Sequence, residues 1–451
     1  MRSRKTHSGQ LNFLAPGLRE QLNPNHRLYR LSEEIDWLYF EEEFSNLYSD
    51  KGRPAHPIRL MVSLLILKSV YDLSDEELVD KHWEMNTYFQ FFSGKEVQQW
   101  GQPCAASDLV HFRKRIGKAG IEKIFKHSIE LHGKASQDHH VSIDTTVQEK
   151  NITYPTDAKL HKRIADKCVK IAEKESLTLR RSYKRTTKQL LRDTYNATHP
   201  RRRKKARSAQ RKLRTIAGRL VRELDRKLPK GVYNKDLELF KKVLAQTRHS
   251  KNKIYSLHEP DVYCIAKGKA AKKYEYGCKG SIALTQNTGI IVGAMTFAEN
   301  AYDGHTLEPA LRQVVQLTGS APKTATVDRG YKGKNNIEAT QIIRPSKPLK
   351  KDSEYQKRKK KKHCKRRAAI EPIIGHLKAD HRAARNFLKG TLGDEINFMM
   401  AATAFNFKKW MDNLSEKLWA LWKIIHRTII FSKINFISTN LNMNHILKMT
   451  F

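Results

Sequence analysis

Residues 139–148 read HHVSIDTTVQ, and this stretch decides the fold class. Val141 and Ile143 alternate with polar residues in a run rich in β-branched side chains, which is the pattern of a β-strand. Asp144 follows directly, so we expect a strand that ends in a carboxylate. The residue pattern changes on both sides of this run, and the pattern of each flank indicates which elements surround the strand.

The segment that follows, residues 156–250, has a helical pattern and is strongly basic. It contains 30 Lys or Arg residues against 9 Asp or Glu residues. Leu213, Ile216, Leu220 and Leu224 recur at helical spacing and form one apolar face. We therefore expect a folded helical hairpin or bundle whose other face is cationic. Because such a charge excess repels itself unless a polyanion is near, DNA contact is favoured over an idle surface.

Strands return after Pro260. Three β-rich runs separated by turn residues predict an antiparallel meander over 261–268, 274–286 and 289–297. A helix over 307–317 and a short strand over 323–327 follow, and Asp328 comes directly after that strand. A further strand is expected at 341–344.

A basic run and a helix that carries a glutamate end this part of the chain. Nine of the eleven residues from Lys357 to Arg367 are basic, which suits either a disordered linker or a loop that follows phosphates. The next predicted helix carries Glu371. The order strand, helical excursion, three strands, helix, two strands and helix predicts one α/β domain interrupted by a helical insertion.

The part before the strand is helical. An apolar run from Leu60 to Val70 follows Pro57, a residue that suits a first helical turn, and Ser74 with Glu77 has the form of a capping box. Two helices joined near Asp72 resemble a helix-turn-helix, although any small helical bundle has the same pattern. A later helix carries basic residues that either contact phosphates or form a solvated face: Arg113, Lys114, Arg115 and Lys118.

Length and charge limit the classes of function. The 451 residues suit two to four domains at about 100 to 200 residues each. The formal net charge of +40 makes nucleic acid the leading partner class. Five cysteines without CxxC spacing suggest neither a disulfide framework nor a zinc site, and they fit a reducing compartment. The most apolar window, 418–431, is interrupted by charges and predicts a packed amphipathic helix in preference to a membrane-surface helix.

Two Asp residues at strand ends and one Glu on a late helix can converge in a single sheet domain. Three carboxylates together need cations, and hard oxygen ligands select Mg²⁺ or Mn²⁺. In a basic protein this arrangement is typical of phosphodiester chemistry. Spacing alone leaves the alternative that Asp144, Asp328 and Glu371 are ordinary solvated carboxylates.

Several motifs, in order, closely resemble the DDE transposases of bacterial insertion sequences, specifically the InsH-like group called insertion-sequence family five. The first acidic motif is SIDTTVQEKNITYPTDAKL from residue 142, and the second region comprises NAYDGHTL from 300 and TVDRGYKG from 326. The third is RRAAIEPIIGHLKADHRAARNFLKG from 366, in which Arg367, Glu371 and Lys378 match the family's spacing. Cys364 stands where related transposases have Tyr. Residues 51–92 are similar to this group's helical N-terminal domain.

The resemblance implies an RNase H-like catalytic core in which Asp144, Asp328 and Glu371 are catalytic and hold two Mg²⁺ ions, with Mn²⁺ as a substitute. It also implies double-stranded DNA as substrate, a homodimer on DNA, and a cytoplasmic, nucleoid-associated protein with no membrane contact. Arg367 and Lys378 are expected to hold phosphates beside the metals. Weaker DNA-contact candidates are Arg329, Tyr331 and His305, the last with capping or packing as an equal alternative.

The expected organisation has four parts. Residues 1–130 form a helical N-terminal DNA-binding domain, 138–155 with 258–411 form the catalytic core, 156–257 form the basic insertion, and 412–451 form a C-terminal helix and tail. The expected function is a transposase that binds its terminal inverted repeats, cleaves DNA and joins the 3′ ends to a target. The alternative is a catalytically silent repressor derived from a transposase, whereas an RNA-binding protein lacks any matching motif.

Overall fold

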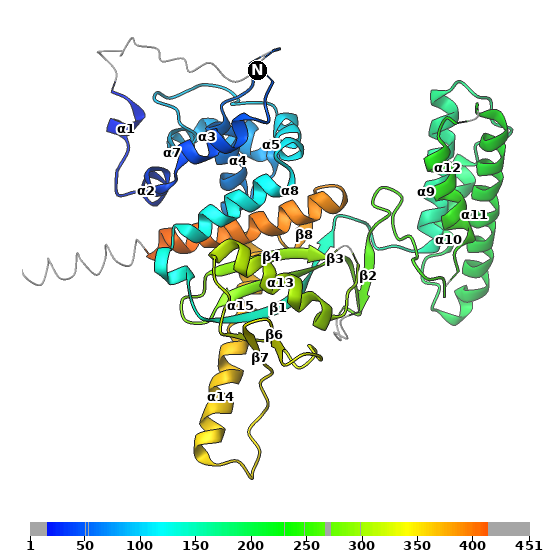
Figure 1. The fold of residues 1–451 in the computed structure, drawn as a ribbon. Helices are drawn as coiled ribbons and strands as arrows, with labels where there is room; N and C mark the ends of the chain where they lie inside the picture. Colours follow the sequence, from blue (N-terminus) through cyan, green and yellow to red (C-terminus); the bar gives the residue numbers. More distant parts are fainter. Residues whose placement is uncertain are drawn as a thin grey trace, which may run out of the picture.

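The computed structural model describes residues 16–49, 51–52, 54–229, 231–247, 249–266, 272–297 and 299–413. A helical N-terminal region lies beside a mixed sheet, and a separate group of helices stands to one side (Figure 1). The mixed α/β class with a helical N-terminal region is therefore confirmed. The predicted helix over 418–431 and the tail lie outside the described residues. No helix in the described part of the chain is long and apolar enough to cross a membrane.

The N-terminal region consists of short helices packed around one long helix. Its elements are α1 (Leu18–Gln21), α2 (Arg27–Glu34), α3 (Trp37–Ser45), α4 (Ile58–Val70), α5 (Asp75–Glu77), η1 (Leu78–His82), α6 (Trp83–Met85), α7 (Thr87–Phe92) and α8 (Ala106–Glu130). Eleven of the thirteen residues of α4 are buried, so this helix is the centre of the region. The capping box of Ser74 and Glu77 is present at the start of α5.

One feature of this region differs from the sequence prediction. Arg113 is buried and binds Asp75 with both terminal guanidinium nitrogens, so it neither contacts phosphates nor lies on a solvated face. The second helix of the predicted helix-turn-helix exposes acidic and basic side chains together: Glu76, Glu77, Asp80 and Lys81. Its DNA-reading role stays a prediction.

The sheet is built around β1 (His140–Lys150). Its strand order is β2-β3-β1-β5-β7-β6, with β4 on β3 and β8 on β1. The other bounds are β2 (Tyr263–Ala266), β3 (Tyr274–Thr285), β4 (Ile291–Phe297), β5 (Thr324–Thr326), β6 (Asn336–Ile337), β7 (Thr340–Ile343) and β8 (Arg385–Asn386), with the 3-10 turn η2 (Gly133–Ser136) before β1. β2, β3 and β4 pair antiparallel, which confirms the predicted meander.

Asp144 does not end its strand, and that expectation was wrong. It lies in the middle of β1, opposite Ile282 of β3. On the other side of β1, β5 pairs only with residues 140–142 and β8 only with 149–150. Between these two pairings the described residues place no strand on β1, and Asp144 sits at this fork in the sheet. The strand continues because β3 is long enough to pair with it to Glu149.

Four helices separate β1 from β2: α9 (Asp157–Lys174), α10 (Lys184–Asp193), α11 (Pro200–Lys227) and α12 (Asn234–Ala245). They pack around an apolar cluster of their own, which includes Ile164, Leu220 and Phe240. The cations of α11 point away from this cluster, because its buried residues recur on one face only. These helices stand clear of the sheet in Figure 1.

The remaining helices come after β4 in the chain. They are α13 (Asp303–Thr318), α14 (Glu354–Ala368), α15 (Ile370–Asp380) and a helix over 390–413. A Cβ at Gly280 of β3 would come within 2.5 Å of the Phe398 ring, so glycine allows close packing of the last helix on the sheet.

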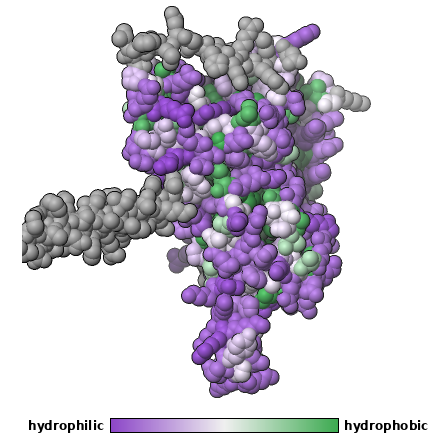
Figure 2. All heavy atoms as spheres, turned by 60° about the vertical axis from the view of Figure 1, so that its left-hand side comes forward, coloured by the Kyte–Doolittle hydropathy of each residue, from purple (hydrophilic) through white to green (hydrophobic). Residues whose placement is uncertain are grey.

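The sequence predicts a linker or a loop over the basic run Lys357–Arg367, and this prediction is wrong. The run forms most of α14, which a capping box at Ser353 begins. No residue of α14 is buried, and the helix projects from the body of the protein (Figure 1). Figure 2 shows that this projecting end is covered almost entirely by hydrophilic side chains.

Candidate active site

Three carboxylates from three different elements surround the guanidinium group of one arginine. The Nη1 atom of Arg367 lies 2.6 Å from Oε1 of Glu371. Its Nη2 atom lies 3.7 Å from Oδ2 of Asp144 and 3.6 Å from Oδ2 of Asp328. The structure thus brings together the three acidic residues singled out in the sequence, and it adds a cation between them.

Local structure explains how each side chain reaches this point. Asp144 projects from the fork in the sheet, and its Oδ1 accepts a hydrogen bond from the backbone N–H of Thr145. Asp328 begins the turn that follows β5, as predicted. Glu371 lies in the first turn of α15 and Arg367 in the last turn of α14, four residues apart across the junction of the two helices. Residues four apart share a helix face.

The site is half open to solvent. The side chains of Asp328 and Glu371 are 50% and 57% exposed, whereas those of Asp144 and Arg367 are 17% and 26% exposed. Only the contact with Glu371 has the length of a charge-assisted hydrogen bond. The other two are charge contacts beyond hydrogen-bond distance. The Nε atom of Arg367 is buried and, within the described residues, has no hydrogen-bond partner.

The donor set suits a hard cation such as Mg²⁺ or Mn²⁺, because all the side-chain ligands are carboxylate oxygens. Among the described residues, no three His, Cys, Asp or Glu side chains are yet close enough to hold a metal ion directly. The guanidinium group of Arg367 lies between these carboxylates in this structure. The carboxylate oxygens fit a hard cation by their chemistry.

Asp303 is a fourth carboxylate near the site that sequence reasoning missed. Its Oδ1 accepts hydrogen bonds from Oγ1 of Thr145 at 2.9 Å and from Nζ of Lys279 at 3.0 Å. It thereby ties the residue after Asp144 to the start of α13. Asp303 stands two residues before His305 in the block NAYDGHTL, so the signal was within a motif already singled out.

Tyr331 lies under the site and not on its surface. It is 1% exposed, and DNA cannot reach its ring in this structure. Burial, followed by the nearby carboxylates Asp144 and Asp303, raises the pKa of Tyr331 above its usual range.

Two other predicted DNA contacts are Arg329, which follows Asp328 directly, and Lys378, which shares α15 with Glu371. Arg329 is exposed, although its Nε donates to the carbonyl of Pro345. Lys378 is half-buried on α15, seven residues after Glu371 and hence on roughly the same helix face.

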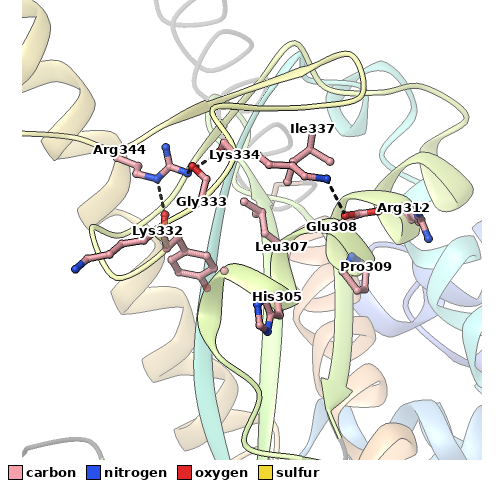
Figure 3. A pocket seen from close by; sticks show the side chains of 12 residues that line it. His305, Leu307, Glu308, Pro309, Arg312, Lys332, Gly333, Lys334, Ile337 and Arg344 are labelled. Atoms are coloured by element: carbon pink, nitrogen blue, oxygen red, sulfur yellow. Dashed lines mark hydrogen bonds and ion pairs between the residues drawn. The ribbon is translucent and has the colours of Figure 1, made fainter.

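His305 is exposed at the start of α13 and lines a pocket of about 490 Å³ beside the site (Figure 3). Its ring packs edge-on against Tyr302. Arg344 holds the far wall by donating to the carbonyls of Gly333 and Lys334. The pocket lining also carries Arg312, Lys332 and Lys334, and Glu308 of the same lining pairs with Arg312 and Lys334.

Comparison with known proteins agrees with this geometry. A family described as "Transposase domain (DUF772)" matches residues 17–115, and one described as "Transposase DDE domain" matches residues 244–407. The second match includes Asp328, Arg367 and Glu371 but begins after Asp144. The chain is also 42% identical over 193 residues to a Rhizobium meliloti protein named "Uncharacterized protein ORF8 in nfe locus". The matched segment covers 42% of this chain and 93% of that protein. No solved structure matches.

Proposed function

The chain belongs to the DDE transposases of insertion sequences, and on that premise we propose that it binds the terminal inverted repeats of its own element, cleaves there and joins the 3′ ends to target DNA. The observation that carries this proposal is the convergence of Asp144, Asp328 and Glu371 on one cation. Asp144 is the decisive member, because it lies outside the matched DDE segment and reaches the other two only through the fold.

In this function the three carboxylates hold divalent metal, with Mg²⁺ the proposed ion and Mn²⁺ a substitute. Asp144, on the central strand, would hold the metal together with Asp328 and Glu371. Bound metal supplies an activated water and charge stabilisation at the leaving 3′ oxygen. The 3′-hydroxyl produced by cleavage then attacks target DNA.

The remaining predicted site residues serve the DNA backbone in this proposal. Arg329 and Lys378, which lie near Asp328 and Glu371 in the sequence, and His305 are proposed to contact phosphates, which position DNA without reading its sequence. Tyr331 is buried, so we assign it a packing role at the site and no DNA contact. The sheet order around β1 is consistent with an RNase H-like core, and the motifs with the InsH-like group. We further propose a homodimer on DNA, acting at the nucleoid.

The test is metal-dependent cleavage of a DNA fragment that carries the ends of the element. With Mg²⁺ the protein is expected to release 3′-hydroxyl ends at the repeats, and with EDTA in place of Mg²⁺ it is expected to release none. Products are resolved on a denaturing gel. Tight binding to the repeats without cleavage in Mg²⁺ or Mn²⁺ would instead favour the silent repressor, for which the presence of all three carboxylates offers no support.

The four helices α9–α12 are proposed to grip DNA phosphates. Arg207 and Arg211 are exposed one turn apart on α11. Substituting both arginines by Glu is expected to reduce the slope of log affinity against log salt concentration by about one to two in magnitude. Each phosphate contact on duplex DNA contributes about 0.9 to that slope.

The control reverses two exposed lysines outside these helices, Lys134 and Lys323, which changes the net charge equally. Affinity is measured by fluorescence anisotropy over a range of salt concentrations. A slope that is the same in both double variants would show that α11 does not contact phosphates.

A further inference from the structure

We propose that Arg367 is a built-in counter-cation of the carboxylate site, and that metal binding displaces it and frees its guanidinium group to bind a DNA phosphate. This inference rests on the proposed function, because it takes the carboxylates as the metal ligands. It adds that the site is never without a cation, and that metal loading and DNA binding share one residue.

The first support is that Arg367 and a metal ion compete for the same oxygens. One guanidinium group contacts Asp144, Asp328 and Glu371 at 3.7, 3.6 and 2.6 Å. Mg²⁺ needs carboxylate oxygens at about 2.0 to 2.1 Å. A cation that draws these oxygens together at such distances cannot share the space with a guanidinium group, because the two positive charges repel each other.

The second support is that Arg367 is held loosely enough to leave. Two of its three partners are at least half exposed, so water screens those contacts. Its buried Nε atom has no hydrogen-bond partner among the described residues. It also lies in the last turn of α14, a helix that buries no residue, so movement there exposes no apolar core.

The third support is what lies beside the site once the side chain moves. Arg367 ends a run with nine basic residues in eleven, and α14 carries this run out from the carboxylates. A freed guanidinium group would extend this cationic helix to the edge of the metal site. Because the metal removes the carboxylates that compete with phosphate for Arg367, metal and DNA each strengthen the binding of the other.

The experiment measures Mn²⁺ affinity of the full chain by isothermal titration calorimetry, first without DNA. Arg367→Gln removes the competing charge and is expected to bind Mn²⁺ about fivefold or more tightly than wild type. The matched control is Lys365→Gln, an exposed residue of the same helix with the same change in charge, expected to stay within about twofold of wild type. An affinity in Arg367→Gln that does not exceed that of Lys365→Gln would overturn the inference.

A second measurement does not depend on calorimetry. Without metal, Arg367→Gln is expected to melt at a lower temperature than Lys365→Gln, because carboxylate repulsion is no longer offset, and to gain more on addition of Mn²⁺. If Arg367→Gln folds poorly, Arg367→Lys is expected to show smaller changes in the same direction, since a point charge cannot reach three carboxylates at once. Equal gains on Mn²⁺ in all variants would contradict displacement.

Asp144→Asn separates this inference from the proposed function. If Asp144→Asn weakens Mn²⁺ binding but Arg367→Gln does not strengthen it, the metal site stands and the displacement fails. If Asp144→Asn leaves Mn²⁺ binding unchanged, the carboxylates are not the metal site and both fail. Adding duplex DNA is expected to raise the Mn²⁺ affinity of wild type, and to raise that of Arg367→Gln by less.

Discussion

Asp144→Asn is expected to lower the rate of Mg²⁺-dependent DNA cleavage by about 10³-fold or more. The substitution keeps the shape of the side chain but removes one negative charge from the fork between β5 and β8. Charge stabilisation by a bound metal contributes several kcal/mol to such a reaction, and each 1.36 kcal/mol corresponds to about a tenfold change in rate. Initial rates on a fragment carrying the element's ends give the comparison.

A matched control shows that the effect belongs to the site. Glu354→Gln makes the same chemical change on α14, where the side chain is 77% exposed and forms an ion pair with Lys357. Its cleavage rate is expected to stay close to wild type. Binding to the repeats should survive in Asp144→Asn, because phosphate contacts carry most of the affinity. A cleavage rate in Asp144→Asn equal to that of the control would remove Asp144 from the catalytic residues.

Lys150→Met is expected to lower the free energy of unfolding by about 3 to 5 kcal/mol, the usual cost of breaking a buried ion pair from one side. Lys150 ends the strand that carries Asp144, and its side chain is 2% exposed. Its Nζ lies 2.7 Å from Oδ1 of Asp394 and 3.6 Å from Oε2 of Glu259, and it donates to the carbonyl of Gly390. Without it, two buried carboxylates face each other.

Asp394 shows why the loss is large. Burial raises the pKa of Asp394 even though Lys150 lowers it, so removal of the lysine leaves this carboxylate without its cation and with the hydrogen bond from Asn386. Urea titrations supply the free energies. Lys272→Met, which breaks the more exposed pair with Glu149 nearby, is the control and should cost less than about 1 kcal/mol.

The double variant Lys150→Met with Asp394→Asn tests whether the two residues act as a pair. Contacting residues are not additive, so the double variant should cost less than the sum of the single ones. Strict additivity would show that Lys150 stabilises the protein by other means.

Local sequence patterns predicted most of the helices and strands, because the formation of these elements depends on residues a few positions apart in the chain. The capping box at Ser74, the strands of the meander and the strand before Asp328 are present where periodicity and turn residues placed them. The extent of β1 was not predictable in this way. Its second half pairs with β3, which lies more than a hundred residues further along the chain, so no local pattern marks where the strand ends.

The basic run of α14 shows the opposite difficulty. Its composition resembles a linker, since the run has no apolar face to signal a helix. Yet Lys and Arg are good helix formers, and a capping box at Ser353 begins the helix. The prediction for Arg113 was wrong for a related reason. Its charge indicated a position on the protein surface, whereas its burial depends on the ion pair with Asp75, which belongs to another helix.

The sequence by itself determined the class of the protein, because ordered motifs and the charge of +40 are properties of the chain and need no coordinates. It also marked Asp144, Asp328 and Glu371 as the residues to examine. Only the tertiary structure decided that these three meet, and that they meet around Arg367. The reason is that distances between residues 144, 328 and 371 depend on which strands pair and where a helix begins, and Coulomb attraction then draws the guanidinium group of Arg367 to the three carboxylates.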